Sequence, residues 1–242
     1  MPQWNQRLSQ ALRADPGKPR LTWYDGDSQR VELSGAVLDN WADKTANLLL
    51  DEVDAGPGTR IGLDLPLHWR TACWAVGIWR TGACVVTDPT SGTDVLVTTR
   101  PADHPSHRGT RIAVALPPLA RAFDGPLAGA VDSAATLLAQ PDALGPVVPP
   151  APDDPALADP TTTLDYQTLT AHPASSPHRV LRTADPATPV RLTDLLGLDV
   201  LADGGSLVLI TTDHPATAPG PARDRLVTAE RITTVEVENS PD

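Results

Sequence analysis

Cations are scarce in this sequence, and lysine is the scarcest, since Lys18 and Lys44 are the only two in 242 residues. The 19 lysine and arginine residues stand against 30 aspartates and glutamates, which gives a formal net charge of −11. Nucleic acids and anionic membrane surfaces are bound through clustered Lys and Arg. We therefore expect neither as a partner, and interpret the acidic balance as one that keeps a protein in solution.

Cysteine and long apolar runs are also lacking. The two cysteines, Cys73 and Cys84, are too few for a disulfide framework, and both lie among apolar residues, so we expect buried thiols. The sequence has no apolar run of 18 residues that could form a transmembrane helix, and residues 1–19 lack the apolar core of a signal peptide. We expect a cytoplasmic protein without a membrane partner.

The clearest pattern that is present runs over residues 57–86. Residues 60–65 alternate between apolar and other side chains, which predicts a strand. Residues 67–80 have apolar positions on more than one stripe, which predicts a helix buried on two sides and ended by Gly82. The continuous apolar run 83–86 is typical of an inner parallel strand. Strand, helix and parallel strand form a right-handed crossover unit.

Elements of the same two kinds alternate along the rest of the chain. Hydrophobic periodicity and turn residues predict helices over 2–14, 37–53 with Ser34 as N-cap, 127–139, 190–202 and 222–231, and one starting within 161–170. Strands are expected as a hairpin over 21–33 and over 94–98, 111–115, 179–183, 207–212 and 233–237. This alternation predicts an α/β fold with a mostly parallel sheet and helices on both faces.

We expect a single α/β domain over residues 1–242, with an N-terminal lobe of about 1–140 and a C-terminal lobe of 161–242. Between them, residues 141–160 are rich in Pro, Asp and Ala. That composition predicts a linker or surface belt, extended in part.

Several segments resemble the N-terminal lobe of the adenylate-forming, AMP-binding enzymes, which include acyl-CoA synthetases, peptide-synthetase adenylation domains and luciferases. PGTRIGLDLP at 57–66 and AVGIWRTGACVV at 75–86 resemble that family's N-terminal signature, and LADGGSLVLI at 201–210 is similar to a later strand. The whole chain resembles a short bacterial family related to these enzymes. The resemblance implies their N-terminal subdomain, truncated before the rest of the enzyme.

An adenylating enzyme needs a glycine- and hydroxyl-rich loop, followed by Pro and Lys, to hold the ATP phosphates. Thr90, Ser91, Gly92 and Thr93 look like the first half of such a loop. We interpret them as a polar turn, because they come too early in the chain and lack the second Gly and the Lys. Asp94 would also place a negative charge beside the phosphates.

The family's other functional motifs have no counterpart either. Residues 161–163 and 175–177, where the phosphate loop is due, contain neither Gly nor Lys. The adenine and magnesium motif, the ribose-binding aspartate and the catalytic lysine are missing as well. The sequence therefore predicts no catalytic residue, no cofactor-binding residue and no cofactor.

Two further groups of residues allow a functional interpretation that we do not adopt. Asp103, His104 and His107 could bind a metal in principle, but Pro105 prevents presentation on a helix, so we assign no metal site. The helix over 67–80 carries aromatic and basic side chains that could stack on a ring, namely His68, Trp69, Arg70, Trp74, Trp79 and Arg80. Core packing of the tryptophans with exposed arginines is the interpretation that we prefer.

These observations predict a catalytically degenerate relative of the acyl-activating enzymes that acts as a binding or interaction protein. Its partner would be a small molecule or another protein, neither of which the sequence identifies. One alternative is a residual enzyme of the superfamily that binds a nucleotide or an acyl ligand, which rests on fold alone. Another is a subunit whose missing half lies on a second chain, which predicts a large exposed apolar patch.

Overall fold

The computed structural model describes residues 3–27, 29–88, 92–171 and 178–236. The helices are α1 (Gln3–Ala14), α2 (Gly35–Val53), α3 (Trp69–Thr81), the 3-10 turn η1 (Pro101–Asp103), α4 (Ser133–Leu137), α5 (Tyr166–Thr170), α6 (Leu192–Leu196), α7 (Asp199–Ala202) and α8 (Pro221–Ala229). The strands are β1 (Pro19–Tyr24), β2 (Arg30–Ser34), β3 (Arg60–Asp64), β4 (Cys84–Val86), β5 (Val95–Thr98), β6 (Thr110–Ala113), β7 (Val131–Asp132), β8 (Pro155–Ala158), β9 (Thr163–Asp165), β10 (Arg179–Ala184), β11 (Ser206–Thr211) and β12 (Thr234–Glu236).

Within these residues the strands form two sheets. The five-stranded sheet has the order β12-β10-β11-β1-β2, and the seven-stranded sheet has the order β7-β6-β5-β3-β4-β8-β9. All neighbouring strands are parallel except for β2 against β1 and β9 against β8. The predicted α/β class, its mostly parallel strands and the first hairpin are confirmed, and the strands divide between two sheets.

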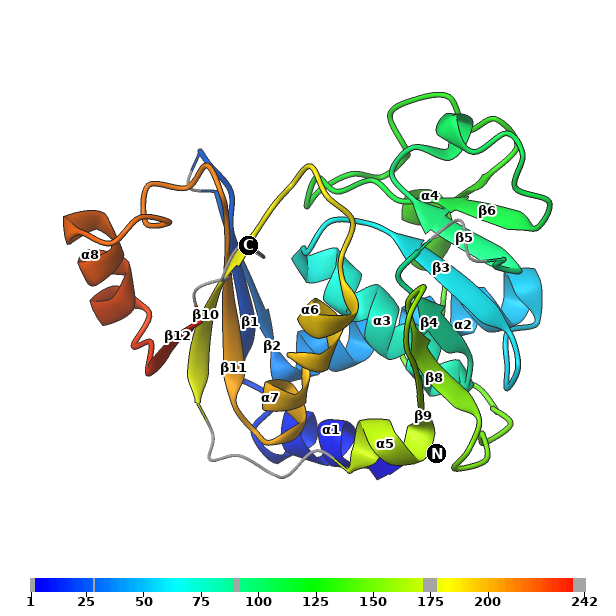
Figure 1. Cartoon of the computed structure of the whole chain (residues 1–242), viewed down its shortest axis with the longest axis horizontal. Helices are drawn as coiled ribbons and strands as arrows, with labels where there is room; N and C mark the ends of the chain where they lie inside the picture. The colour runs from blue at the N-terminus through cyan, green and yellow to red at the C-terminus, as the bar shows by residue number, and fades with distance from the viewer. Residues whose placement is uncertain (1–2, 28, 89–91, 172–177, 237–242) are drawn as a thin grey trace.

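Helices lie between the two sheets, and α3 is the central one (Figure 1). All 13 residues of α3 are buried, as the broad apolar pattern of its sequence predicts. It packs closely on α2, where a Cβ at Gly77 would lie 2.6 Å from Thr45 Cγ2. On the other side of the five-stranded sheet lies α8, so this sheet has helices on both faces (Figure 1).

The predicted caps of the two central helices are confirmed. The hydroxyl of Ser34 accepts a hydrogen bond from the backbone N–H of Val37 at the start of α2, and Gly82 ends α3 with φ 88°, a conformation that glycine adopts without strain. At 19 residues α2 is long, but it contains charged side chains throughout. In the described segments no helix is both long and apolar enough to cross a membrane.

The arginines of α3 are buried, so the expectation that they are exposed is wrong. Arg80 is 1% exposed and forms ion pairs with Asp39 and Asp43 of α2. Arg70 is 6% exposed and donates hydrogen bonds to backbone carbonyls of the segment after β6. Burial of a charge is tolerated where partners replace the lost water. Here those partners come from distant parts of the chain.

Two predicted helices are shorter in the structure. In place of a helix over 127–139 there are β7 and the five-residue α4, because Ala128 and Gly129 have φ values of 49° and 84° that a right-handed helix cannot contain. The helix expected over 190–202 is divided into α6 and α7 at Gly197, where α6 ends. Glycine weakens a helix interior, which favours an end at that point.

The proline-rich segment contributes a strand to the seven-stranded sheet. Within residues 141–160, β8 pairs in parallel with β4, and its residues 156–158 are buried. The five-stranded sheet combines residues 19–34 with residues 179–236, so both ends of the chain build one sheet. The seven-stranded sheet contains β3 to β9, which span residues 60–165. The boundaries expected at residues 140 and 160, between an N-terminal and a C-terminal lobe, therefore fall inside the segment that builds this sheet.

Both cysteines are buried thiols, as predicted. Burial raises the pKa of the Cys73 thiol to about 12 and that of the Cys84 thiol to about 11. Since the thiolate is the reactive form, both groups are inert at neutral pH.

Candidate functional site

A cavity of about 320 Å³ lies where the carboxyl ends of strands from both sheets face one another. Its lining residues lie near the ends of β1 and β11 or follow β1, β3, β6 and β10, and Gln29 directly precedes β2. In open α/β sheets ligands bind at the carboxyl ends of the strands. Most of the wall is apolar, formed by Trp23, Leu67, Leu116 and the prolines Pro66, Pro117, Pro118 and Pro186. We call this cavity the inter-sheet cleft.

His68 provides a fixed polar group in this apolar wall. It is the N-cap of α3, and its Nδ1 accepts a hydrogen bond from the backbone N–H of Arg70 at 3.1 Å. Burial, with the nearby Arg70 charge, lowers the pKa of His68 to about 3. The ring is therefore neutral at pH 7, and because Nδ1 is an acceptor, Nε2 bears the proton and can donate.

Two other polar groups of the cleft are buried without a partner among the described residues. They are the indole Nε1–H of Trp23 and the hydroxyl of Thr211. Their residues are 8% and 4% exposed, and the Trp23 ring meets the His68 ring edge to face at 4.5 Å between centroids. Buried polar groups in native proteins nearly always have a hydrogen-bond partner. Both residues line the cleft, but the two polar atoms have almost no accessible surface, so a molecule bound there would reach them only after a local side-chain shift.

Arg70 holds one wall of the cleft in place. Its guanidinium lies 4.3 Å from the ring centroid of Trp69 and 5.5 Å from that of Trp41. From this position Nη2 donates to the carbonyl oxygens of Pro117 and Pro118, at 3.0 and 3.2 Å. Arg70 is thus hydrogen-bonded to backbone carbonyls and is not a lining residue, and apart from His68 the described lining residues include one acidic or basic side chain, that of Asp25.

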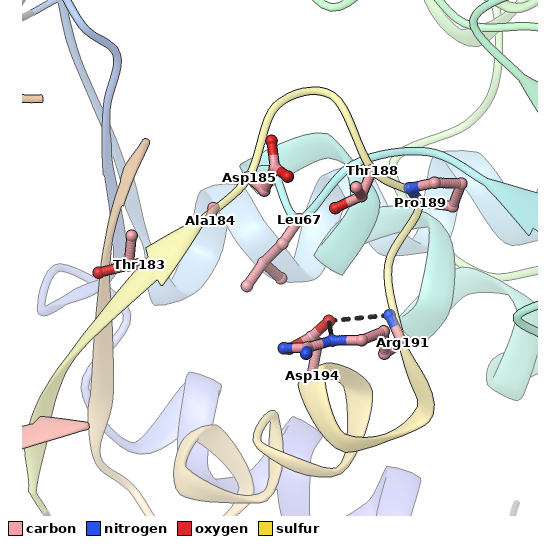
Figure 2. A pocket seen from close by; sticks show the side chains of 8 residues that line it. All are labelled: Leu67, Thr183, Ala184, Asp185, Thr188, Pro189, Arg191 and Asp194. Carbon is pink, nitrogen blue, oxygen red and sulfur yellow. Dashed lines mark hydrogen bonds and ion pairs between the residues drawn. The ribbon is translucent and has the colours of Figure 1, made fainter. Parts of the chain in front are cut away.

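Figure 2 shows a second cavity, of about 270 Å³, and one of its lining residues is Leu67. Since Leu67 also lines the inter-sheet cleft, the two cavities adjoin. It lies beneath the loop that joins β10 to α6 and has Asp185 and Thr188 on its wall. Figure 2 shows Arg191 beside Asp194, to which its backbone N–H and guanidinium both donate. The positive charge of this cavity is therefore paired, and the cavity offers no unpaired cation for a phosphate group within the described residues.

The segment that looks like a phosphate loop lies away from the cleft. Thr90 and Ser91 fall outside the described residues, and Gly92 and Thr93 precede β5. The Gly92 carbonyl accepts a hydrogen bond from Arg60, the first residue of β3. This contact places the described half of the segment at the amino ends of β3 and β5, the edge of the sheet opposite the cleft.

The three residues considered for a metal site do not come together. His104 Nε2 lies 3.0 Å from Asp64 Oδ2, while Asp103 lies 4.0 Å from the guanidinium of Arg100. His107 donates its backbone N–H to the His104 carbonyl in a turn. Over the part of the chain that the structure describes, no three His, Cys, Asp or Glu side chains could hold a metal ion together.

Sequence reasoning singled out His68 among the aromatic and basic residues of its helix, but it did not identify Trp23 or Thr211 and did not predict the cleft. Trp23, His68 and Thr211 lie on separate elements, and the sequence contains no motif that joins them. One general signal was present, because each lies at the end of a predicted strand or in the residues that follow it. In a parallel sheet those positions meet at one edge.

No family model matches the chain. A Mycobacterium tuberculosis protein named "TIGR03089 family protein" is 35% identical over 243 residues, covering 94% of this chain and 95% of that protein.

Solved structures with the same fold are less similar in sequence, at 16% identity. The acyl-CoA synthetase of Brucella canis matches 94% of this chain with a TM-score of 0.69, and the acetoacetyl-CoA synthetase of Streptomyces lividans matches 96% with a TM-score of 0.72, each at 16% identity. The match covers 46% and 42% of those two chains, so this chain spans somewhat less than half of their length. The N-terminal domain of FACL13 from Mycobacterium tuberculosis matches with a TM-score of 0.69 at 16% identity, covering 97% of this chain and 62% of that one. These matches confirm the fold that the sequence resemblance implies.

Proposed function

The chain belongs to the TIGR03089 family, and from that membership together with the cleft we propose that it is a non-catalytic binding protein for a small, uncharged, largely apolar molecule. One observation carries the proposal. The residues Trp23, His68 and Thr211 line an apolar cavity, and the Trp23 indole N–H and the Thr211 hydroxyl are buried without a partner among the described residues. A ligand site of this kind typically combines apolar walls with a few fixed polar groups.

The charge of the cleft supports a neutral ligand. All three residues can donate a hydrogen bond, so the ligand would present an acceptor such as a carbonyl oxygen. The Asp25 carboxylate at the same cavity would repel a phosphate or a carboxylate. A volume of about 320 Å³ is at the small end of the range for ligand sites, which favours a compact molecule over a whole nucleotide.

The sequence supports the absence of adenylating activity. It lacks a phosphate loop with Gly and Lys, and its two lysines, Lys18 and Lys44, match no catalytic position of the adenylate-forming enzymes. Two of the solved structures with this fold, from Brucella canis and Mycobacterium tuberculosis, are named as acyl-CoA synthetases, so acyl compounds are the natural first ligands to test. The alternative, a residual enzyme of the superfamily that binds a nucleotide or an acyl ligand, rests on that fold.

The test is thermal melting of the whole chain with hexanamide, hexanoate, AMP, ATP and CoA. A ligand at about 100 times its Kd adds roughly 2.7 kcal/mol to the stability of the folded state. We expect hexanamide to raise the Tm. Hexanoate has the same carbon chain but a negative charge, which the Asp25 carboxylate would repel, so it should raise the Tm much less. In Thr211→Val the shift with the amide should shrink.

Other outcomes would overturn the proposal. If none of the compounds changes the Tm, the cleft is not a site for small acyl ligands. If ATP and a carboxylate together release pyrophosphate, the protein is an enzyme and the alternative holds. Pyrophosphate release is measured on the same preparation, with enzyme-free samples as the control.

A further inference from the structure

A third cavity, separate from the two described above, lies at the other end of the five-stranded sheet and has a charged lining. The amino ends of β1, β10 and β11 meet there because these strands are parallel. The cavity has a volume of about 290 Å³, and its polar lining consists of Lys18, Glu32, Arg179, Ser206, Glu230 and Arg231. It lies at the end of the sheet opposite the inter-sheet cleft.

Side-chain alternation places this cavity on the face of the sheet that α8 covers. Arg179 and Ser206 are neighbours in the β10–β11 register and share a face with Leu181 and Val208, two residues further along. Leu181 and Val208 belong to a small apolar cluster that includes Leu226 of α8. The cavity is therefore bounded by the strand ends and by the residues that follow α8.

The two carboxylates of the cavity are already paired. Glu230 accepts hydrogen bonds from Tyr24, Arg30 and Arg179, and Arg30 also pairs with Glu32. Burial raises the pKa of Glu230, but these hydrogen bonds outweigh it and lower the pKa to about 2. Both acidic side chains therefore have cationic partners of their own.

The remaining cations of the cavity have no acidic partner within the described residues. The guanidinium of Arg231 has no hydrogen bond or ion pair there, and Lys18 Nζ donates to the Gly204 carbonyl at 3.3 Å. Both side chains are exposed, and no acidic side chain among the described residues neutralises them, whereas Arg179 of the same cavity is paired with Glu230. Arg231 also has φ 52°, a left-handed conformation that costs a non-glycine residue about 1 kcal/mol or more.

We propose that this cavity binds a phosphate-type dianion, either inorganic phosphate or the phosphate group of a monoester. Lys18 and Arg231 supply the two positive charges that balance a dianion. The Ser206 hydroxyl accepts a hydrogen bond from Arg179 Nη1 at 3.2 Å, so its own proton is available to an anion oxygen. Arg and Lys are the residues that hold phosphate groups in proteins, through charge-assisted hydrogen bonds.

The proposal is tested by isothermal titration of the whole chain with inorganic phosphate and, separately, with methyl phosphate, at constant ionic strength set with chloride. We expect both to bind, and the tighter of the two identifies the source of the anion. The decisive variant is Arg231→Gly, because glycine adopts a positive φ without strain and the protein should remain folded with an unchanged or higher Tm. Arg231→Lys should retain binding.

Charge-assisted hydrogen bonds are strong enough that Arg231→Gly and Lys18→Gln should each weaken binding roughly tenfold or more. The matched control is Arg225→Ala, which removes the same charge from an exposed position of α8 outside the cavity. It should bind as the unaltered protein does. The proposal is overturned if the unaltered protein binds neither anion, or if Arg231→Gly binds them as tightly.

Discussion

Two buried threonines at strand ends should respond to the same substitution with opposite signs. Thr98, at the end of β5, is fully buried, and its hydroxyl donates to Asp64 Oδ2 at 2.7 Å and accepts from the Arg100 N–H at 2.9 Å. Thr211, at the end of β11, is 4% exposed, and its hydroxyl has no partner among the described residues. Valine has nearly the same shape as threonine and lacks the hydroxyl. Thr98→Val and Thr211→Val therefore compare a satisfied hydroxyl with an unsatisfied one.

The magnitudes follow from the hydrogen bonds. A hydrogen bond to a charged group contributes about 1.5–3 kcal/mol, so Thr98→Val should lower the free energy of unfolding by that amount. A buried polar group without a partner costs about 1–3 kcal/mol, so Thr211→Val should raise the free energy of unfolding of the ligand-free protein. With a urea m-value of about 2 kcal/mol/M, a gain of 2 kcal/mol moves the unfolding midpoint up by about 1 M.

The assay is urea unfolding followed by fluorescence of the six tryptophans, with both variants and the unaltered protein measured side by side. If Thr211→Val lowers the midpoint as Thr98→Val does, the Thr211 hydroxyl has a partner in the free protein. The Thr211 hydroxyl would then need no ligand in the inter-sheet cleft to satisfy it.

Three further predictions concern the core and the charge network. Arg80→Met should lower the free energy of unfolding by about 3–5 kcal/mol, because it leaves the buried Asp43 carboxylate without its cation; a loss below 1 kcal/mol in urea unfolding would contradict this. The pKa of Glu230 falls from 4.5 to about 2 on folding, so the stability that its ionised form contributes is complete above pH 4.5 and is lost as the pH falls toward 2. Unfolding curves of Glu230→Gln and the unaltered protein should therefore differ at pH 7 and converge near pH 2, and a constant difference would refute the assignment. Gly77→Ala should destabilise the protein by about 1–3 kcal/mol despite the higher helix propensity of alanine, because its Cβ would lie 2.6 Å from Thr45 Cγ2; an increase in the Tm would show that α2 moves aside.

The crossover unit β3–α3–β4 could be predicted from the sequence because its signals are local. Alternation along residues 60–65, the broad apolar pattern of the helix and the glycine at position 82 act through neighbours within a few residues. The same reasoning failed for residues 127–139, where the apolar pattern suggests a helix but residues 128 and 129 have positive φ. Only the structure shows that conformation.

The burial of Arg70 and Arg80 required the tertiary structure. A charged side chain in an apolar helix is expected to face water, because burial without partners is costly. The compensating groups are Asp39 and Asp43 of α2 for Arg80, and the carbonyls of residues 116–118 for Arg70. Each pairing joins residues that lie far apart in the sequence, so no local pattern contains it.

By itself the sequence determined the α/β class, the family resemblance and the net charge of −11, because each is a sum over residues or a pattern between near neighbours. The tertiary structure decided that the strands form two sheets and that their carboxyl ends enclose a cleft lined by Trp23, His68 and Thr211. It also decided that Lys18 and Arg231 meet at one cavity in an acidic protein. Parallel pairing of β1, β10 and β11 brings the two ends of the chain together, and only that long-range pairing sets which side chains become neighbours.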